Sequence, residues 1–289
     1  MAVVGFVGLG VMGAPMAGHL AAAGHTGTCY NRTEAKAAAW VQSHGGQSAA
    51  SPRLAAEGAD VVFLCVGRDD DVRAVVFGPD GVLASMRRAS VLVDHTTASA
   101  DIARELAATC HAHGLGFVDV PVSGGQAGAV NGSLTVMCGG EQAHFDAVAP
   151  VMQAYAKACT LMGPSGSGQL TKMVNQLAIA GVVQGLAEAM HFAARAGLDV
   201  DQVIDVIGKG AAQSWQLDNR GRTMWRGEFD FGFAVKWMRK DLQICLDAAR
   251  DNGARLPLAA LVDQLYAQVT ARGGERWDTS SLVHLLDNP

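Results

Sequence analysis

The chain has 289 residues, a length that is long for one domain and suits two. Apolar residues make up 49% of it and charged residues 17%, which is typical of a globular protein and excludes a disordered one. The net charge is −5 and no block of Lys or Arg occurs, so the composition argues against nucleic acid as a partner.

Neither the six cysteines nor the nine histidines show the spacing of a metal site. No C-x-x-C or H-E-x-x-H motif occurs, and His111 and His113, two positions apart on a predicted helix, lie on different faces. We therefore expect no bound metal, and reduced cysteines that pack as small core residues.

The first 31 residues contain no Asp, Glu, Lys or Arg, a pattern that a signal peptide or membrane segment would share. No positively charged segment precedes the apolar run, however, and Pro15 and seven glycines interrupt it. No other stretch reaches the roughly 18 unbroken apolar residues of a membrane span. We therefore expect a soluble, cytoplasmic protein with no membrane partner.

An apolar, β-branched run at 3–7 leads into three glycines spaced G-x-G-x-x-G, and a helical pattern follows over 14–23. Gly8 would allow a sharp turn, Gly10 a close approach of the backbone to a pyrophosphate, and Gly13 close packing of helix on strand. The helix would then direct unpaired N–H groups at the phosphates. This pattern favours dinucleotide binding over a plain strand-to-helix turn. The expected cofactor contacts here are Gly8, Leu9, Gly10, Val11, Met12 and Gly13.

The second predicted strand, 26–30, is followed by Asn31, Arg32 and Thr33. NAD-binding domains usually place an Asp or Glu here to accept hydrogen bonds from the ribose 2′-OH. With Asn31 in that place and the guanidinium of Arg32 beside it, the site would prefer NADPH or NADP+, with NADH as the alternative. Asn31 and Thr33 could instead cap the helix that starts near Glu34.

Strands and helices alternate through the first half of the chain, as in a doubly wound sheet. The further predicted strands are 59–66, 90–93, 116–120 and 133–139, and the predicted helices include 100–113 and 141–154. Such sheets bind ligands at their strand ends. We therefore expect Cys65 and Val66 to line the cofactor ribose. Thr96 and Thr97 would bond the nicotinamide, its ribose or the substrate, with helix capping as the alternative.

The stretch Ser123-Gly124-Gly125 follows the strand at 116–120. Its glycines permit a turn whose backbone N–H groups could bind an anion such as a carboxylate, and the Ser123 hydroxyl would add a donor. From these residues alone, a simple loop is the other interpretation.

The glycine-rich stretch 163–168 is the clearest break in composition, and we place a domain boundary after Gly163. A long helix follows over 167–196, with an apolar stripe of Leu170, Met173, Val174, Leu177, Ala180 and Gly181, and Gly197 ends it. The remaining predicted elements are helices at 200–207, 211–222, 234–251, 258–271 and 279–286. The sequence therefore predicts an α/β Rossmann domain over 1–163 followed by an all-α domain over 164–289, joined by a long interdomain helix.

Lys172, Asn175 and Gln176 stand at i, i+3 and i+4 and so share one face of the long helix. Lys172 is the only charged residue between Lys157 and Glu188. A lysine near a helix start is ordinarily a solvated side chain. The residues alone leave both a catalytic and a solvated Lys172 open.

Five motifs, in order along nearly the whole chain, resemble those of the β-hydroxyacid dehydrogenase family. They are Gly8-Leu9-Gly10-Val11-Met12-Gly13, Asp94-His95-Thr96-Thr97, Pro121-Val122-Ser123-Gly124-Gly125, Lys172-Met173-Val174-Asn175-Gln176 and Lys240-Asp241-Leu242. The family includes 3-hydroxyisobutyrate dehydrogenases, tartronate semialdehyde reductases and glyoxylate or succinic semialdehyde reductases.

The resemblance implies roles for particular residues. Lys172 would give a proton to the carbonyl oxygen during reduction and take it back during oxidation, while Asn175 would orient the substrate. Lys240 would close over cofactor and substrate. The substrate-binding residues implied are Thr96, Ser123, Gly124, Gly125, Lys172, Asn175, Gln176 and Lys240, and Ser214, Trp215 and 231–233 either shape the pocket or belong to the core. The family also implies a homodimer or homotetramer.

The expected function is the NADP(H)-dependent interconversion of a small β-hydroxyacid and its semialdehyde, in a cleft between the two domains. Tartronate, succinic or methylmalonate semialdehyde, or glyoxylate, would be the substrate. The pair Asn175-Gln176 resembles the tartronate semialdehyde reductase group, whereas several relatives carry Asn-Asn. Two alternatives stay open: an imine reductase, a class that usually lacks the lysine, and a non-catalytic NADP-binding scaffold protein.

Overall fold

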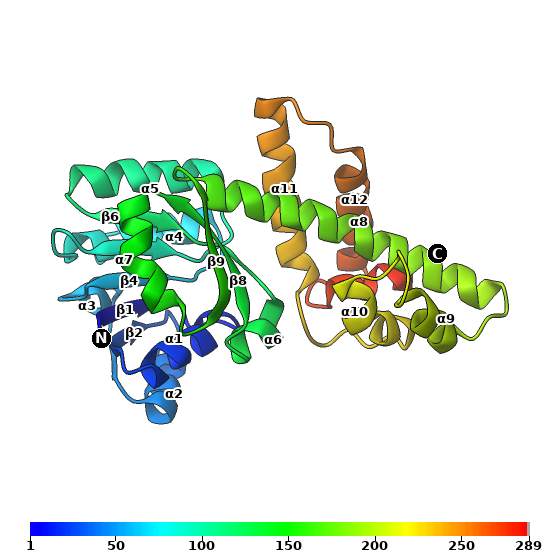
Figure 1. Cartoon of the computed structure of the whole chain (residues 1–289), viewed down its shortest axis with the longest axis horizontal. Helices are drawn as coiled ribbons and strands as arrows, with labels where there is room; N and C mark the ends of the chain where they lie inside the picture. Colours follow the sequence, from blue (N-terminus) through cyan, green and yellow to red (C-terminus); the bar gives the residue numbers. More distant parts are fainter. Residues whose placement is uncertain (288–289) are drawn as a thin grey trace. The chain divides into compact units, whose positions relative to one another are not determined.

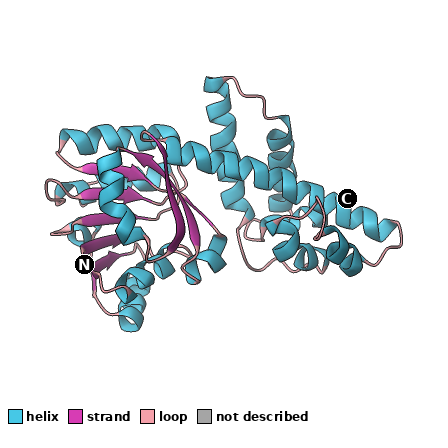
Figure 2. Cartoon of the chain, viewed as in Figure 1, coloured by secondary structure: helices cyan, strands magenta, loops and turns pink. Residues whose placement is uncertain are grey.

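The computed structural model describes residues 1–287. The chain divides into two compact units, the first ending at Lys172 and the second beginning at Met173. The described strands all lie in the first unit, and the second is helical (Figures 1 and 2). The predicted α/β domain followed by an all-α domain is confirmed, whereas the predicted boundary after Gly163 stays a prediction.

Nine strands of the first unit form one sheet. They are β1 Val3–Val7, β2 Thr26–Tyr30, β3 Gln47–Ser48, β4 Val61–Leu64, β5 Val91–Asp94, β6 Gly116–Asp119, β7 Val122–Ser123, β8 Leu134–Gly140 and β9 Ala156–Gly163. The first six are parallel and run in the order β3-β2-β1-β4-β5-β6. The order reverses between β1 and β4, and doubly wound sheets bind ligands at the carboxyl ends of the strands beside such a reversal.

The last three strands extend the sheet beyond β6. β8 runs antiparallel to β6 and β7 and parallel to β9. β9 lies outside the predicted strands, although Cys159 and Leu161 pack against the core while Thr160 and Met162 are exposed. Its sequence contains a single β-branched residue, Thr160, so the strand signal is weak.

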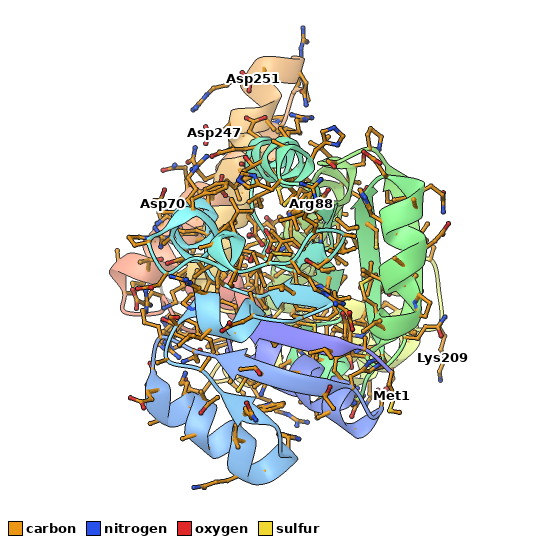
Figure 3. The ribbon with its side chains drawn as sticks, turned by 90° about the vertical axis from the view of Figure 1, so that its left-hand side faces the viewer. Met1, Asp70, Arg88, Lys209, Asp247 and Asp251 are labelled. Atoms are coloured by element: carbon orange, nitrogen blue, oxygen red, sulfur yellow. The ribbon has the colours of Figure 1, made fainter. Side chains whose placement is uncertain are left out.

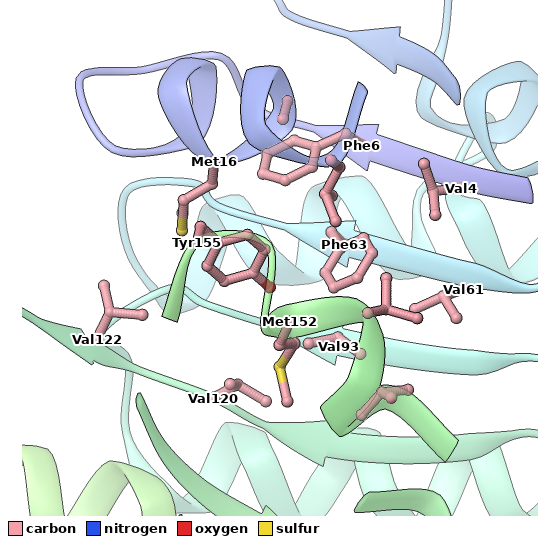
Figure 4. Packing of buried hydrophobic residues seen from close by; sticks show 14 of the residues in the cluster. Val4, Phe6, Met16, Val61, Phe63, Val93, Val120, Val122, Met152 and Tyr155 are labelled. Atoms are coloured by element: carbon pink, nitrogen blue, oxygen red, sulfur yellow. The ribbon is translucent and has the colours of Figure 1, made fainter. Parts of the chain in front are cut away.

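Helices cover both faces of this sheet. In the first unit they are α1 Gly13–Ala22, α2 Glu34–His44, α3 Pro52–Ala56, α4 Asp69–Phe77, α5 Ala100–Ala112, α6 Gly125–Val130 and α7 Gln142–Met152, with a 3-10 turn at Val82–Ala84. All four residues of β4 are buried. Val61 and Phe63 belong to one hydrophobic cluster, which Figure 4 shows with Met16 and Tyr155, and Val62 and Leu64 belong to another. The alternation follows from the two-residue period of a strand.

The second unit consists of helices around one hydrophobic cluster. They are α9 Val200–Ile207, α10 Trp215–Trp225, α11 Val235–Asn252, α12 Pro257–Ala271, a 3-10 segment Thr279–Val283 and α13 His284–Asp287. Three of these match the predicted ranges within one residue. The helix predicted at 211–222 begins later because Ser214 caps it, accepting a hydrogen bond from the N–H of Leu217. Charged side chains such as Asp70, Arg88 and Asp247 lie on the outside (Figure 3).

The long helix α8, Ser167–Arg195, agrees with its predicted range. Its predicted apolar stripe is wrong at the start, because Leu170 and Val174 are exposed while Gln169, Lys172 and Gln176 are buried. The hydrophobic pattern misled here because polar contacts to other segments, described below, turn these side chains inward.

Of the helices described within residues 1–287, α8 alone has a length and a mean hydropathy, 1.4 over 18 residues, that would suit a membrane span. The core helix of a soluble protein has the same properties. Ala180, Val183, Ala187 and Met190 are fully buried in the hydrophobic cluster of the second unit. These contacts are those of a core helix.

Candidate functional site

The turn between β1 and α1 bears out the predicted roles of Gly8 and Gly13 and leaves space for that of Gly10. Gly8 adopts φ +102°, and a Cβ on it would collide with the carbonyl oxygen of Cys65. A Cβ on Gly13 would collide with the carbonyl oxygen of Gly8, so α1 can lie this close to β1 only with glycine there. A Cβ on Gly10 would meet nothing within 4 Å. The backbone at Gly10 therefore has open space, which is what a closely approaching pyrophosphate needs.

The start of α1 is suited to an anion. Met12 stands at the N-cap without a side-chain hydrogen bond, and the first turn carries no acidic residue. The first N–H groups of a helix have no partner inside the helix, and its dipole favours negative charge. The residues of the turn thus fit the phosphates of a dinucleotide.

The end of β2 is tied to the same turn through Asn31. Its Oδ1 accepts a hydrogen bond of 3.0 Å from the N–H of Leu9, and its Nδ2 donates to the carbonyl oxygen of Thr33 at 3.1 Å. Thr33 stands at the N-cap of α2, as the alternative predicts, but its side chain makes no capping hydrogen bond, and the Asn31 amide bonds Leu9 and Thr33 instead. The Arg32 side chain is 90% exposed, with its guanidinium 3.8 Å from Asp71. A 2′-phosphate would find a cation here and no carboxylate at position 31.

The loops after β4 and β5 are joined by hydrogen bonds. The N–H of Val66 donates to Oγ1 of Thr96 at 3.0 Å, and Thr96 is 1% exposed. Thr97 and Cys65 are half-buried. The cap of α5 is Ser99, which accepts from the N–H of Ile102, so neither threonine caps it. This geometry leaves Thr97 better placed than Thr96 to meet a ligand.

The loop Ser123–Gly125 is a turn that depends on its two glycines. Gly124 and Gly125 have φ angles of +133° and +61°, in the region that favours glycine, and both are exposed. A Cβ on Gly125 would meet nothing within 4 Å. Ser123 lies at the end of β7, half-buried. Successive N–H groups in such a turn, with a serine hydroxyl beside them, suit a carboxylate.

The start of α8 is held by two buried residues that the sequence patterns do not single out. The carboxylate of Asp119, at the end of β6, accepts from the N–H of Gly166 at 2.7 Å and of Gln169 at 2.9 Å. The Gln169 amide donates to the carbonyl oxygen of Thr96 at 2.7 Å and accepts from the N–H of Ala98 at 3.1 Å. Lys172 follows one turn later on the same helix and is 7% exposed.

The second unit contains a polar cluster of its own. Asn175 donates to Oε1 of Gln176 at 2.8 Å, and Nε2 of Gln176 donates to Oδ2 of Asp241 at 2.6 Å. The Lys240 ammonium lies 3.2 Å from Oδ1 of Asp241. Asp241 is 1% exposed. The apolar spacing of α11, set by Val235, Met238, Leu242, Cys245 and Ala249, instead predicts that Asp241 falls on the polar side of the helix. The burial of Asp241 is explained by its hydrogen bond with Gln176, which lies 65 residues away in the sequence.

Burial shifts the acidity of the polar groups at the strand ends. It raises the pKa of the Asp94 carboxyl to about 7 and that of Asp119 to about 6, although hydrogen bonds from N–H groups oppose both shifts. Burial also lowers the pKa of His95 to about 4. A neutral His95 ring can donate from Nδ1 to the Val120 carbonyl at 2.7 Å and accept at Nε2 from the Tyr155 hydroxyl at 2.8 Å. His95 is therefore a core residue, stacked on Phe63.

Other sites are less well supported. Within residues 1–287, no group of three His, Cys, Asp or Glu side chains could hold a metal ion. A cavity of about 470 Å³ lies beside the amino ends of β1 and β2, lined by residues that include His25, Trp40 and His44. It is at the edge of the sheet opposite the strand ends described above. The glycine turn and the loops beside it are the better candidates for ligand binding.

Comparisons with known proteins cover nearly the whole chain. Residues 3–163 match the NAD binding domain of 6-phosphogluconate dehydrogenase, and residues 166–286 match a family described as NAD-binding of NADP-dependent 3-hydroxyisobutyrate dehydrogenase. An uncharacterized oxidoreductase of Shewanella frigidimarina is 63% identical, over 99% of each chain. The 2-hydroxy-3-oxopropionate reductase of Escherichia coli is 34% identical, over 98% of this chain and 97% of the relative. The structure of Mycobacterium tuberculosis 3-hydroxyisobutyrate dehydrogenase with L-serine superimposes with a TM-score of 0.89 at 32% identity, covering 99% of each chain.

These matches agree with the fold, and the matched ranges include the glycine turn, Ser123–Gly125 and Lys172. They do not test the role of any single residue, so the roles of Lys172, Asn175, Gln176 and Lys240 stay predictions. The chain is an NAD(P)-binding oxidoreductase that belongs to the β-hydroxyacid dehydrogenase family.

Proposed function

We propose that this protein is an NADP(H)-dependent enzyme that interconverts a small β-hydroxyacid and its semialdehyde. The observation that carries the proposal is the burial of Lys172, which is 7% exposed on a helix turn anchored to the loop after β5. A lysine that serves solubility extends its ammonium into water. Burial of this one favours a chemical role.

The residues of the first unit supply the parts that the reaction needs. The nicotinamide of a dinucleotide whose pyrophosphate binds at the glycine turn would supply or accept the hydride. Lys172 would donate a proton to the carbonyl oxygen in reduction and accept it in oxidation, as general acid and base. The N–H groups of Gly124 and Gly125 and the Ser123 hydroxyl would hold the substrate carboxylate. The structure of the mycobacterial relative with L-serine, a small hydroxyacid, is in keeping with this class of ligand.

The preference for NADPH over NADH rests on the end of β2. Asn31 replaces the usual carboxylate, and its amide is turned toward the glycine turn by the bond from Leu9. Arg32 is exposed beside it and can pair with a 2′-phosphate. The family description that matches residues 166–286 also names an NADP-dependent enzyme.

The substrate is proposed as a class. Tartronate and methylmalonate semialdehydes are the candidates that give a β-hydroxyacid on reduction. Succinic semialdehyde and glyoxylate, which give a γ- and an α-hydroxyacid, are further candidates because they too carry a carboxylate close to a reducible carbonyl. The Escherichia coli relative that reduces 2-hydroxy-3-oxopropionate supports tartronate semialdehyde within this set.

A steady-state panel of these four aldehydes with NADPH and with NADH tests the proposal. We expect turnover of at least one aldehyde, faster with NADPH. Lys172→Ala should lower kcat about 10²- to 10⁴-fold, the usual contribution of a general acid, while NADPH still binds. Lys172→Ala with unchanged kcat would refute the lysine mechanism. NADPH binding without turnover of any member would favour a non-catalytic binding protein.

We also propose that the protein is a homodimer or homotetramer. Several apolar side chains of the second unit are exposed in the single chain, including Val174, Val182 and Phe192 on α8 and Leu258 and Leu261 on α12. Exposed apolar residues on neighbouring helices are typical of surfaces that another subunit covers. Light scattering of the purified protein gives the mass directly, and a monomer would contradict the proposal.

A further inference from the structure

The helix that carries Lys172 begins without a cap of its own. The residues around its first turn are Gly166, Ser167 and Gly168, and the capping oxygen comes instead from Asp119, on a strand 47 residues earlier. One carboxylate oxygen accepts from Gly166 and the other from Gln169. Local N-caps normally satisfy these N–H groups. Here the cap also fixes the helix to the end of β6.

Two glycines make room for this carboxylate. A Cβ on Gly139 would lie 2.5 Å from Oδ1 of Asp119, and a Cβ on Gly168 would lie 2.8 Å from Oδ2. The Gly168 Cβ would also lie 2.6 Å from the carbonyl oxygen of Met137. Contacts under 3.0 Å are essentially never seen for real Cβ atoms. The start of α8 is thus seated on β6 and β8 as closely as backbone allows.

Gln169 makes a second attachment, on the face of the helix that carries Lys172. It is 0% exposed, and its amide both donates to Thr96 and accepts from Ala98. Gln169 and Lys172 stand at i and i+3, so they share one face one turn apart. The loop to which Gln169 binds contains Thr97, a predicted cofactor contact.

We propose that Asp119 and Gln169 are positioning residues that fix where the Lys172 ammonium stands relative to the loop after β5. Asp119 fixes the distance of the first turn of α8 from the sheet. Gln169 fixes the orientation of that turn about the helix axis, so that the face with Lys172 is turned toward the loop after β5. The inference rests on the proposed role of Lys172 as the proton donor. A displacement of about 1 Å in a reacting group can lower a rate about 100-fold, so loss of either attachment should be visible in kcat.

The first test removes the two side-chain bonds of Gln169 without shortening the side chain. We expect Gln169→Met to lower kcat about 10- to 100-fold while the Kd for NADPH changes less than about twofold. The matched control is Gln184→Met, since Gln184 is also a mostly buried glutamine of α8, bonded to Glu188. It should lose a similar amount of Tm and keep its kcat.

The second test replaces the capping carboxylate. Asp119→Asn should lower kcat in the same way, because an amide cannot accept at both atoms. Its matched control is Asp263→Asn, which breaks the buried ion pair with Arg239 in the second unit. We expect that control to lower Tm and to leave kcat unchanged.

A double variant separates positioning from general damage. If Gln169 acts through the lysine, adding Gln169→Met to Lys172→Ala should lower the residual kcat less than about twofold. A further 10-fold loss in that background would overturn the inference, as would a kcat for Gln169→Met equal to that of Gln184→Met. If Lys172→Ala itself keeps full kcat, the proposed role of Lys172 as the proton donor fails, and the positioning role fails with it. If Lys172→Ala is inactive while Gln169→Met and Asp119→Asn are fully active, only the positioning role fails.

Discussion

Two helices that begin in the first unit, α1 and α8, start after glycine-rich turns, yet different groups surround their first N–H groups. At α1 no side chain caps the first N–H groups, and the space at Gly10 is open. At α8 the carboxylate of Asp119 accepts from those groups and two glycines enclose it. Both helices begin with N–H groups that have no partner inside the helix. At α1 these groups are open to the phosphates of a ligand, whereas at α8 a protein carboxylate binds them and fixes the helix to the sheet.

The largest effect should come from filling the space beside the anchor. Gly168→Ala places a Cβ within 3.0 Å of Met137 and Asp119 oxygens, and overpacking of this kind costs about 3 kcal/mol. Alanine is otherwise the better helix former by about 1 kcal/mol, so a loss of stability reports the clash itself. Chemical denaturation of the purified variant measures the free energy of unfolding.

Gly185→Ala is the control for that experiment. Gly185 lies in the same helix, is exposed, and its Cβ would meet nothing within 4 Å. This variant should be as stable as the original or up to about 1 kcal/mol more stable. If Gly168→Ala and Gly185→Ala changed the free energy of unfolding equally, the start of α8 would not be packed closely against β6 and β8.

The next largest effect is a pH dependence of stability at the start of α8, where a carboxyl group caps the helix. The start of α1 has no such group. Burial raises the pKa of Asp119 from 3.8 to about 6, so between these values the folded protein binds more protons at this site than the unfolded chain. The stability that Asp119 contributes is therefore present at low pH and is lost as pH rises through 6. The difference in unfolding free energy between the original protein and Asp119→Asn should fall by about 2 kcal/mol from pH 4 to pH 7.

The difference in unfolding free energy between the original protein and Asp119→Asn largely cancels the contributions of the other buried titratable groups. Asp94, with a pKa of about 7, and His95, with one of about 4, titrate in both. His95 changes the stability in the opposite direction with pH, because its ring binds a proton more readily in the unfolded chain than when it is buried. A difference that stays constant or grows with pH would show that the Asp119 carboxyl has an ordinary pKa in the folded protein.

The contrast between the two helix starts also explains what the sequence could predict. The glycine turn at 8–13 is recognisable because the spacing of its three glycines is local, within one strand, turn and helix. The stretch 163–168 has just as many glycines, and the sequence marks it only as a break in composition. Its partner, Asp119, lies about 50 residues away, where no spacing rule reaches.

The same limit accounts for the errors along α8 and α11. Apolar spacing assigns Leu170 and Val174 to the core and Asp241 to the surface, and each assignment is wrong. The buried polar side chains are held by partners on other elements, Thr96 for Gln169 and Gln176 for Asp241. Hydrophobic periodicity identifies helix faces that pack against apolar neighbours. It assigns a face that is buried through polar contacts to the surface, which is the error made here.

A smaller effect is expected at the open turn, where a side chain should harm the ligand and not the fold. Gly10→Ala should leave the Tm of the cofactor-free protein within about 2 °C, because its Cβ meets nothing within 4 Å. It should raise the Kd for NADPH about 10-fold, or about 1.4 kcal/mol, because the backbone can no longer approach the pyrophosphate as closely. Fluorescence titration with NADPH gives the Kd, and an unchanged value would place the phosphates elsewhere.

The smallest expected effect concerns the part of the open site that distinguishes NADPH from NADH. Arg32 is an exposed guanidinium, and one ion pair formed at the surface is worth at most about 1 kcal/mol. Arg32→Ala should therefore lower kcat/KM with NADPH about fivefold and leave that with NADH unchanged. Lys209→Ala, which removes an exposed cation of the second unit (Figure 3), should change neither value. The NADPH effect should also shrink as salt rises, because salt screens an exposed pair. A loss that is equal for both cofactors would assign Arg32 to the fold of the β2 end, leaving Asn31 alone to account for the cofactor preference.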